Sequence, residues 1–167
     1  RWVVTPSGGI DKIAAFLALF GTTRLHIAVV TDFAASQEGY LSYPRDSELL
    51  RHGHVVTLDK YAGKAQADLE GVIGHRTYVE LTRNAYNLER DAVRPIEHSG
   101  KSGVKVANEV GEFMLSLPQG SGSQANNRFD RYRPAEFLIQ QGMDFQLPDL
   151  DGALKRFESL FQDLNDM

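Results

Sequence analysis

The chain has 167 residues, of which 42% are hydrophobic, and this is enough for one domain with a sizeable core rather than a disordered chain. Cysteine is absent, which excludes disulfides, thiolate catalysis and cysteine-bound zinc and favours a cytoplasmic protein; no apolar run approaches the ~20 residues that span a membrane. The formal net charge of −4 argues against general attraction to nucleic acid, although a local basic patch or a bound cation can reverse the field at one site.

The N-terminal stretch has the order strand, helix, strand. Residues Trp2–Thr5 are predicted to form a strand, and the Gly-rich turn that follows leads into a helix over about Ile10–Phe20. The next segment, Leu25–Thr31, contains a run of β-branched residues typical of a strand that is buried on both faces. This order predicts a βαβ unit with a parallel sheet.

Asp32 follows the second expected strand directly. In open α/β sheets, ligands bind outside the carboxyl ends of the strands, so Asp32 is a candidate functional carboxylate. Aspartate is also common as a simple cap where a strand ends, and this alternative stays open.

A second acidic group comes after the third expected strand. That strand is predicted over His54–Leu58, and a loop over Tyr61–Gln66 leads from it to Asp68 and Glu70. Two carboxylates two residues apart lie on the same side of an extended segment. With the aspartate at position 32 they form an all-oxygen set of the kind that Mg²⁺ or Mn²⁺ prefers. A solvated acidic loop is the alternative.

The C-terminal half is predicted to be helical. Apolar residues at helical spacing favour helices over about 76–86, 104–117, 135–141 and from 149 to the end. Residues 119–127 are rich in small and polar side chains, and we expect a flexible hinge there. We therefore divide the chain into an α/β core over 1–90 and a helical extension over 91–167. The last three helices are expected to pack together as a cap.

Two lysines flank the start of the helix that is expected over 104–117. Lys101 lies in a Gly-Ser loop, and Lys105 lies early in the helix. A lysine beside a metal site can neutralise the charge that develops on a phosphate, whereas a lysine at a helix end is otherwise a solvated charge. The run Gly100-Lys101-Ser102 is not a Walker A motif, because Pro95 stands where the first glycine is required.

A basic and aromatic cluster precedes the helix expected near residue 135. Arg128, Arg131 and Arg133 alternate with Phe129 and Tyr132. Such a cluster can contact phosphates, or it can form a packed corner held by arginine pairs. The sequence leaves both interpretations open.

Four short motifs occur in an informative order: Thr5–Lys12 (TPSGGIDK), Ala28–Asp32 (AVVTD), Ala67–Glu70 (ADLE) and Arg131–Ala135 (RYRPA). In this order they resemble the C-terminal TOPRIM region of the OLD (overcoming lysogenization defect) family of nucleases, which couple an ABC-type ATPase to a TOPRIM nuclease. The resemblance covers most of the chain and is strongest over Trp2–Tyr86. It implies an α/β fold with a TOPRIM-like, mainly parallel sheet flanked by helices, followed by a C-terminal helical extension.

The resemblance also implies roles for individual residues. The site of this family holds a glutamate on the first strand, a DxD motif on a later strand, further acidic residues and a lysine. Asp32 matches the first carboxylate of the DxD motif, and Ala34 stands in place of the second. Asp68 and Glu70 match the later acidic segment, with Gly71 where another acid is often found.

Two of the family's residues are less directly matched. Lys101 or Lys105 would be the lysine. The first-strand glutamate has no counterpart, and the chain begins without an initiator methionine. We therefore expect sequence upstream of Trp2 that carries this glutamate and the ABC-type ATPase.

The resulting expectation is a metal-dependent DNA endonuclease domain. Asp32, Asp68 and Glu70 would hold one or two Mg²⁺ or Mn²⁺ ions, and a homo-oligomer is compatible with the resemblance. The alternative is a degenerate TOPRIM module that serves in DNA binding or assembly, which Ala34 and Gly71 favour. A receiver-like signalling domain with the aspartate at position 32 as phosphoacceptor fits poorly, because its acidic pair should precede that strand.

Overall fold

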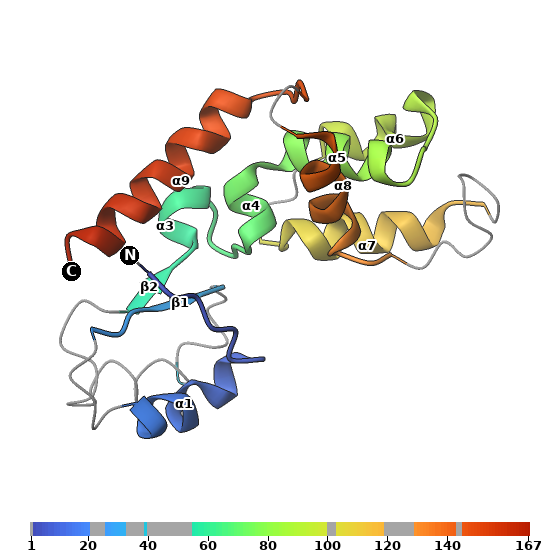
Figure 1. Cartoon of the computed structure of the whole chain (residues 1–167). Coiled ribbons are helices and arrows are strands. Elements are labelled where there is room, and N and C mark those ends of the chain that lie inside the picture. Colours follow the sequence, from blue (N-terminus) through green and yellow to red (C-terminus); the bar gives the residue numbers. More distant parts are fainter. Residues whose placement is uncertain are drawn as a thin grey trace.

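A computed structural model of the chain describes residues 2–20, 26–32, 39, 55–99, 103–118, 129–142 and 145–167 (Figure 1). These residues form a mixed α/β structure that is mainly helical. Its elements, in chain order, are η1 (Ile10–Lys12), α1 (Ile13–Phe20), β1 (Val29–Thr31), β2 (Val55–Thr57), α3 (Asp59–Ala62), α4 (Leu69–Ile73), α5 (His75–Ala85), α6 (Arg90–Glu97), α7 (Val106–Ser116), α8 (Arg133–Gln141) and α9 (Leu150–Asn165).

The two described strands form a small parallel sheet that separates α1 from the other helices. Val29 lies opposite Val55 and Thr31 opposite Thr57, in parallel register. Because side chains alternate along a strand, Val29 and Val55 pack against α1, while Val56 packs with residues of α3, α4 and α9 on the other side. The parallel pairing of these two strands, predicted from the chain order, is confirmed.

The strand predicted over Trp2–Thr5 is not formed. Residues 2–7 have no regular secondary structure, and the side chains of Val3 and Val4 are almost fully exposed. The segment is attached instead through Trp2, whose indole N–H donates to Asn165 Oδ1 over 2.9 Å near the end of α9. β-propensity expresses packing against neighbouring strands, and neither of the two described strands pairs with residues 2–7.

The helices predicted from long apolar stripes are present as α5, α7, α8 and α9. Three shorter helices differ from the expectation: α3 occupies the start of a segment predicted as a loop, α4 replaces an extended segment, and α6 was not predicted. The hinge predicted over 119–127 lies outside the described residues. None of the helices in the described part of the chain is both long and apolar enough to cross a lipid bilayer.

The C-terminal helices pack mainly on the middle of the chain rather than on one another. α8 lies against α5, α7 lies against α4 and α5, and α9 lies along α3 and α4 (Figure 1). The predicted cap of mutually packed helices is therefore wrong. The largest hydrophobic cluster joins α5 with α6 and α7, so its side chains come from both sides of residue 90. The physical reason is that the apolar face of α5 is wide enough to bury several neighbours.

Candidate functional site

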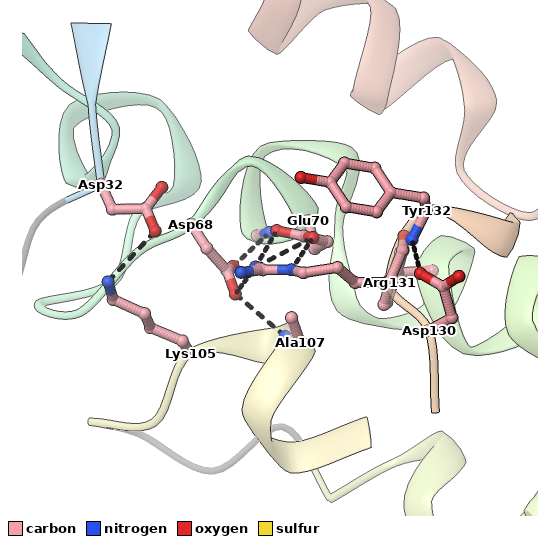
Figure 2. Close-up of polar contacts among 10 residues, drawn as sticks. Asp32, Asp68, Glu70, Lys105, Ala107, Asp130, Arg131 and Tyr132 are labelled. Atoms are coloured by element: carbon pink, nitrogen blue, oxygen red, sulfur yellow. Dashed lines mark hydrogen bonds and ion pairs between the residues drawn. The ribbon is translucent and has the colours of Figure 1, made fainter. Parts of the chain in front are cut away.

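Asp32 and Lys105 meet where β1 ends. Asp32 follows the last residue of the strand, and Lys105 is the N-cap residue of α7. The ammonium Nζ of Lys105 lies 3.1 Å from Asp32 Oδ2 (Figure 2). The Asp32 side chain is 37% exposed, so one of the predicted acids is both paired and accessible to solvent. Lys101, the other candidate lysine, lies outside the described residues.

A cavity of about 790 Å³ reaches this ion pair. It is lined by residues of the N-terminal segment, by α1 and by β1, and both Asp32 and Lys105 contribute to its wall. A volume of this size lies within the range of small-molecule sites in proteins. The Asp32–Lys105 pair therefore borders a cavity at the carboxyl end of β1.

Asp68 is fully buried and connects two helix N-termini. It is the N-cap of α4, where its Oδ1 accepts a hydrogen bond from the amide of Gly71 over 2.8 Å. Its Oδ2 accepts a second bond, over 2.9 Å, from the amide of Ala107 in the first turn of α7 (Figure 2). Helix N-termini carry unpaired N–H groups and a partial positive charge, which compensate a buried carboxylate.

The predicted extended geometry of Asp68 and Glu70 is wrong. The two residues are the N-cap and the second residue of α4, so the alternation of an extended segment does not apply to them. The start of α4 is indicated in the sequence by Asp68 itself, because aspartate is a preferred N-cap residue.

The presence of glycine at position 71 has a local structural reason. A Cβ atom at this position would lie 3.2 Å from Asp68 Oδ1 and 3.4 Å from the Cβ of Ala62. A larger side chain, including the acid that the family resemblance leads us to expect, would press on the carboxylate that caps α4.

Glu70 faces Arg131, which lies 61 residues away in the sequence. Arg131 Nε donates to Glu70 Oε1 and Nη2 donates to Oε2, each over 3.1 Å, which makes a bidentate pair. Arg131 Nη2 is also 4.0 Å from Asp68 Oδ2. The Glu70 side chain is 12% exposed and that of Arg131 46% exposed. Figure 2 shows the guanidinium beside both carboxylates.

The electrostatics of this pair reflect burial and opposite charge. Burial raises the pKa of Glu70, and the neighbouring Arg131 opposes part of that rise. Burial alone would lower the pKa of Arg131, but the field of Glu70, Asp32 and Asp68 raises it. The guanidinium therefore lies within the electrostatic field of all three predicted acids.

The basic and aromatic cluster contributes both to this site and to a packed corner. The guanidinium of Arg133 lies 4.4 Å from the centre of the Tyr86 ring and donates to the carbonyl of Ala85 over 3.0 Å. Arg131 is the residue that reaches the acids. Sequence reasoning selected it as a candidate for phosphate contact and missed its pairing with Glu70, because nothing in the local sequence reports a partner so far away.

The three predicted acids, Asp32, Asp68 and Glu70, supply only oxygen donors, which is the donor type that Mg²⁺ and Mn²⁺ prefer. Among the residues that the structure describes, no group of three or more His, Asp or Glu side chains is arranged to hold a metal ion. Mg²⁺ is commonly bound by one or two carboxylates together with waters and substrate phosphates. In this structure Asp32 and Glu70 pair with side-chain cations, whereas both oxygens of Asp68 accept backbone amides.

Comparisons of the chain with protein-family models, with curated proteins and with solved structures give no match. The TOPRIM and OLD assignments therefore remain a prediction that rests on the motifs.

Proposed function

We propose that this chain is a metal-dependent DNA endonuclease domain of OLD type, with its site at the carboxyl end of β1. The observation that carries the proposal is the presence of two carboxylate–cation pairs, Asp32 with Lys105 and Glu70 with Arg131 (Figure 2). Their four side chains come from four separate segments of the chain. Metal-dependent phosphodiester hydrolysis needs carboxylates to bind the metal ion and cations to neutralise the phosphate.

Each side chain has a distinct task in this proposal. Asp32 and Glu70 would hold Mg²⁺ or Mn²⁺, which supplies an activated water and neutralises phosphate charge when it is bound. Lys105 places a positive charge beside Asp32, where it can face a phosphate oxygen. Asp68 is a positioning residue, because it accepts hydrogen bonds from the first turns of both α4 and α7. Glu70 lies in that turn of α4, and Lys105 directly precedes α7. Its direct participation in metal binding stays a prediction.

The resemblance extends the proposal to partners. DNA would be the substrate, and an upstream ABC-type ATPase domain of the same protein would be a partner. Assembly into a homo-oligomer is a further expectation of this kind.

The proposal is tested by nicking of supercoiled plasmid in the presence of Mg²⁺ or Mn²⁺. Asp32→Asn and Glu70→Gln should each lower the nicking rate by at least ~100-fold, because each removes a charge that binds the metal. Asp91→Asn is the matched control, since Asp91 is an exposed acid on α6 that pairs with Arg94. Full activity of Asp32→Asn would contradict the proposal.

One observation favours a second function, a degenerate module for DNA binding or assembly. Asp32 and Glu70 are each neutralised by a side-chain cation, and Asp68 is committed to two helix caps. Such a site is electrically balanced without a metal. If the wild-type chain binds plasmid DNA in a gel-shift assay and leaves it uncut with either metal, this second function is the better one.

A further inference from the structure

A second cavity, of about 270 Å³, lies among α3, α4, α5 and α9. It shares none of its described lining residues with the larger cavity at the end of β1. Basic side chains are concentrated on its wall, which includes Lys64, His75, Arg76 and Arg156. Asp149 is the one acid among its described lining residues.

The charge on this wall is mainly positive. His75 Nε2 lies 3.3 Å from Glu109 Oε2, and burial lowers the pKa of His75, so its ring is neutral at pH 7. The remaining lining residues set the cations of Lys64, Arg76 and Arg156 against the single carboxylate of Asp149. Three positive charges and one negative charge leave an excess of two positive charges.

The strongest indication of an anionic ligand is Lys64. Its Nζ atom is buried and has no hydrogen-bond partner among the residues that the structure describes. Burying an ammonium group without a compensating charge is costly, and buried charges in proteins are therefore paired. A negatively charged group in the cavity would supply the partner that the described part of the chain does not.

The first turn of α5 adds backbone donors to the same wall. Gly74 is the N-cap residue of this helix and has no side chain that could bond the first amides. His75, Arg76 and Thr77, whose amides belong to this turn, all line the cavity. Helix N-termini carry unpaired N–H groups and a partial positive charge, and together these bind anions such as phosphate. The helix therefore acts in the same direction as the cationic side chains.

Arg156 is held in place at the cavity and keeps donors for a ligand. Its Nε and Nη2 donate to the carbonyls of Val72 and Ile73, and Nη2 also lies 3.2 Å from Asp149 Oδ2. Its Nη1 makes no hydrogen bond with the described residues. At Gly74, which has a φ of +104°, a Cβ atom would lie 2.7 Å from Nη2. Glycine thus lets the guanidinium approach the start of α5.

We propose that this cavity binds a phosphate dianion, either as inorganic phosphate or as the terminal phosphate of a small phosphomonoester. The inference concerns a separate cavity and does not depend on nuclease activity. An excess of two positive charges matches a terminal phosphate, which carries nearly two negative charges at pH 7, better than the single charge of each DNA diester. A volume of about 270 Å³ is near the lower end of small-molecule sites, which suits a compact ligand.

The test is titration calorimetry of the 167-residue chain in phosphate-free buffer, with inorganic phosphate and glycerol 3-phosphate as probes. The wild-type chain should bind at least one of them with a Kd on the order of 1 mM or tighter. Lys64→Gln should weaken this binding at least ~tenfold, because it removes the buried cation. Lys155→Gln is the matched control, since Lys155 is an exposed lysine of α9 outside the cavity lining and should leave the affinity unchanged.

A second variant should act in the opposite direction. Asp149→Asn removes the one acid of the described wall, and asparagine tolerates the φ of 55° at this position. It should bind phosphate at least ~threefold more tightly than the wild-type chain, because a repulsive charge is gone.

Three results would overturn the inference. One is binding of both probes by the wild-type chain that is weaker than ~10 mM, and another is equal phosphate affinity of Lys64→Gln and the wild-type chain. The third comes from a short DNA duplex in place of the probes: if Lys64→Gln weakens binding of the duplex while neither probe binds the wild-type chain, these cations contact a DNA backbone instead. If Lys64→Gln fails to fold by circular dichroism, Asp149→Asn decides, and a phosphate affinity equal to or below that of the wild-type chain overturns the inference.

Discussion

Asp68 and Glu70 are neighbours in sequence with different environments. The carboxylate of Asp68 is fully buried and ends on two backbone amides, while that of Glu70 ends on a guanidinium at the surface. A backbone amide cannot move away without unwinding a helix turn, whereas a half-exposed side chain can. The first carboxylate is therefore suited to holding structure and the second to exchanging partners.

Replacing Asp68 should destabilise the fold itself. Asp68→Asn keeps one acceptor oxygen but turns an amide donor toward one of the two N–H groups, which leaves a buried donor without a partner. We expect a loss of about 2–4 kcal/mol in the free energy of unfolding, measured by urea denaturation with chelator present. Asp32→Asn and Asp91→Asn should each lower the free energy of unfolding by less than about 0.5–1 kcal/mol, because Asp32 is partly exposed and Asp91 is largely exposed. Equal stability of Asp68→Asn and the wild-type chain would contradict the double-cap role.

The element that carries these residues, α4, has only five residues and depends on its neighbours. Isolated helices of this length do not form in water. Asp68 caps its N-terminus, and at its C-terminus Arg156 of α9 donates from Nε to the carbonyl of Val72 over 2.7 Å and from Nη2 to that of Ile73 over 2.8 Å. The same guanidinium lies 3.2 Å from Asp149. The long helix α9 therefore holds the short helix on which Glu70 is displayed.

Removing this contact should loosen α4. Arg156→Met leaves the two carbonyls without their charged donor, and we expect a loss of about 1–3 kcal/mol in the free energy of unfolding. Lys155→Met is the matched control on the adjacent, exposed position of α9 and should change stability by less than about 0.5 kcal/mol. Urea denaturation of both variants provides the comparison, and similar losses for the two would exclude a specific role of Arg156.

The elements that could be predicted from the sequence are those whose apolar residues recur at a regular spacing. The apolar stripe of α9 reports one buried face, and that helix was located correctly. The β-branched run before Asp32 does contain a strand, but β1 covers only Val29–Thr31 and Val30 is 43% exposed, so the expected burial on both faces is wrong. Short helices such as α4 and α6 have too few residues for a period, and α6 also contains Pro95. Their existence depends on contacts made by distant segments.

The site was predictable to a similar degree. Asp32 and Lys105 were selected because they lie at the end of a strand and the start of a helix, and the structure brings them together. The partner of Glu70 was not predictable, because an ion pair across 61 residues leaves no local pattern. The strand expected over Trp2–Thr5 failed for the same reason, since pairing partners decide whether a β-prone segment becomes a strand.

At the scale of the whole molecule, the described residues bury three separate hydrophobic clusters of unequal size. The largest surrounds α5, and a second joins β2 with α3, α4 and α9. The third contains only two buried side chains, Ile13 and Leu17 of α1, packed with residues of the sheet. The Asp32–Lys105 pair of the candidate site joins the end of β1 to the start of α7.

This inequality predicts that the molecule opens first at α1. Six residues of α5 are buried but only two of α1, and Leu19 in α1 is largely exposed. The free energy of opening that exposes the amides of α1 to exchange should be lower than that of α5 by on the order of 2 kcal/mol or more. Native-state hydrogen exchange under increasing denaturant measures both values. Because the cavity beside α1 reaches Asp32 and Lys105, such an opening would also widen access to the candidate site. Equal protection of α1 and α5 at every denaturant concentration would show instead that the three clusters unfold as one unit.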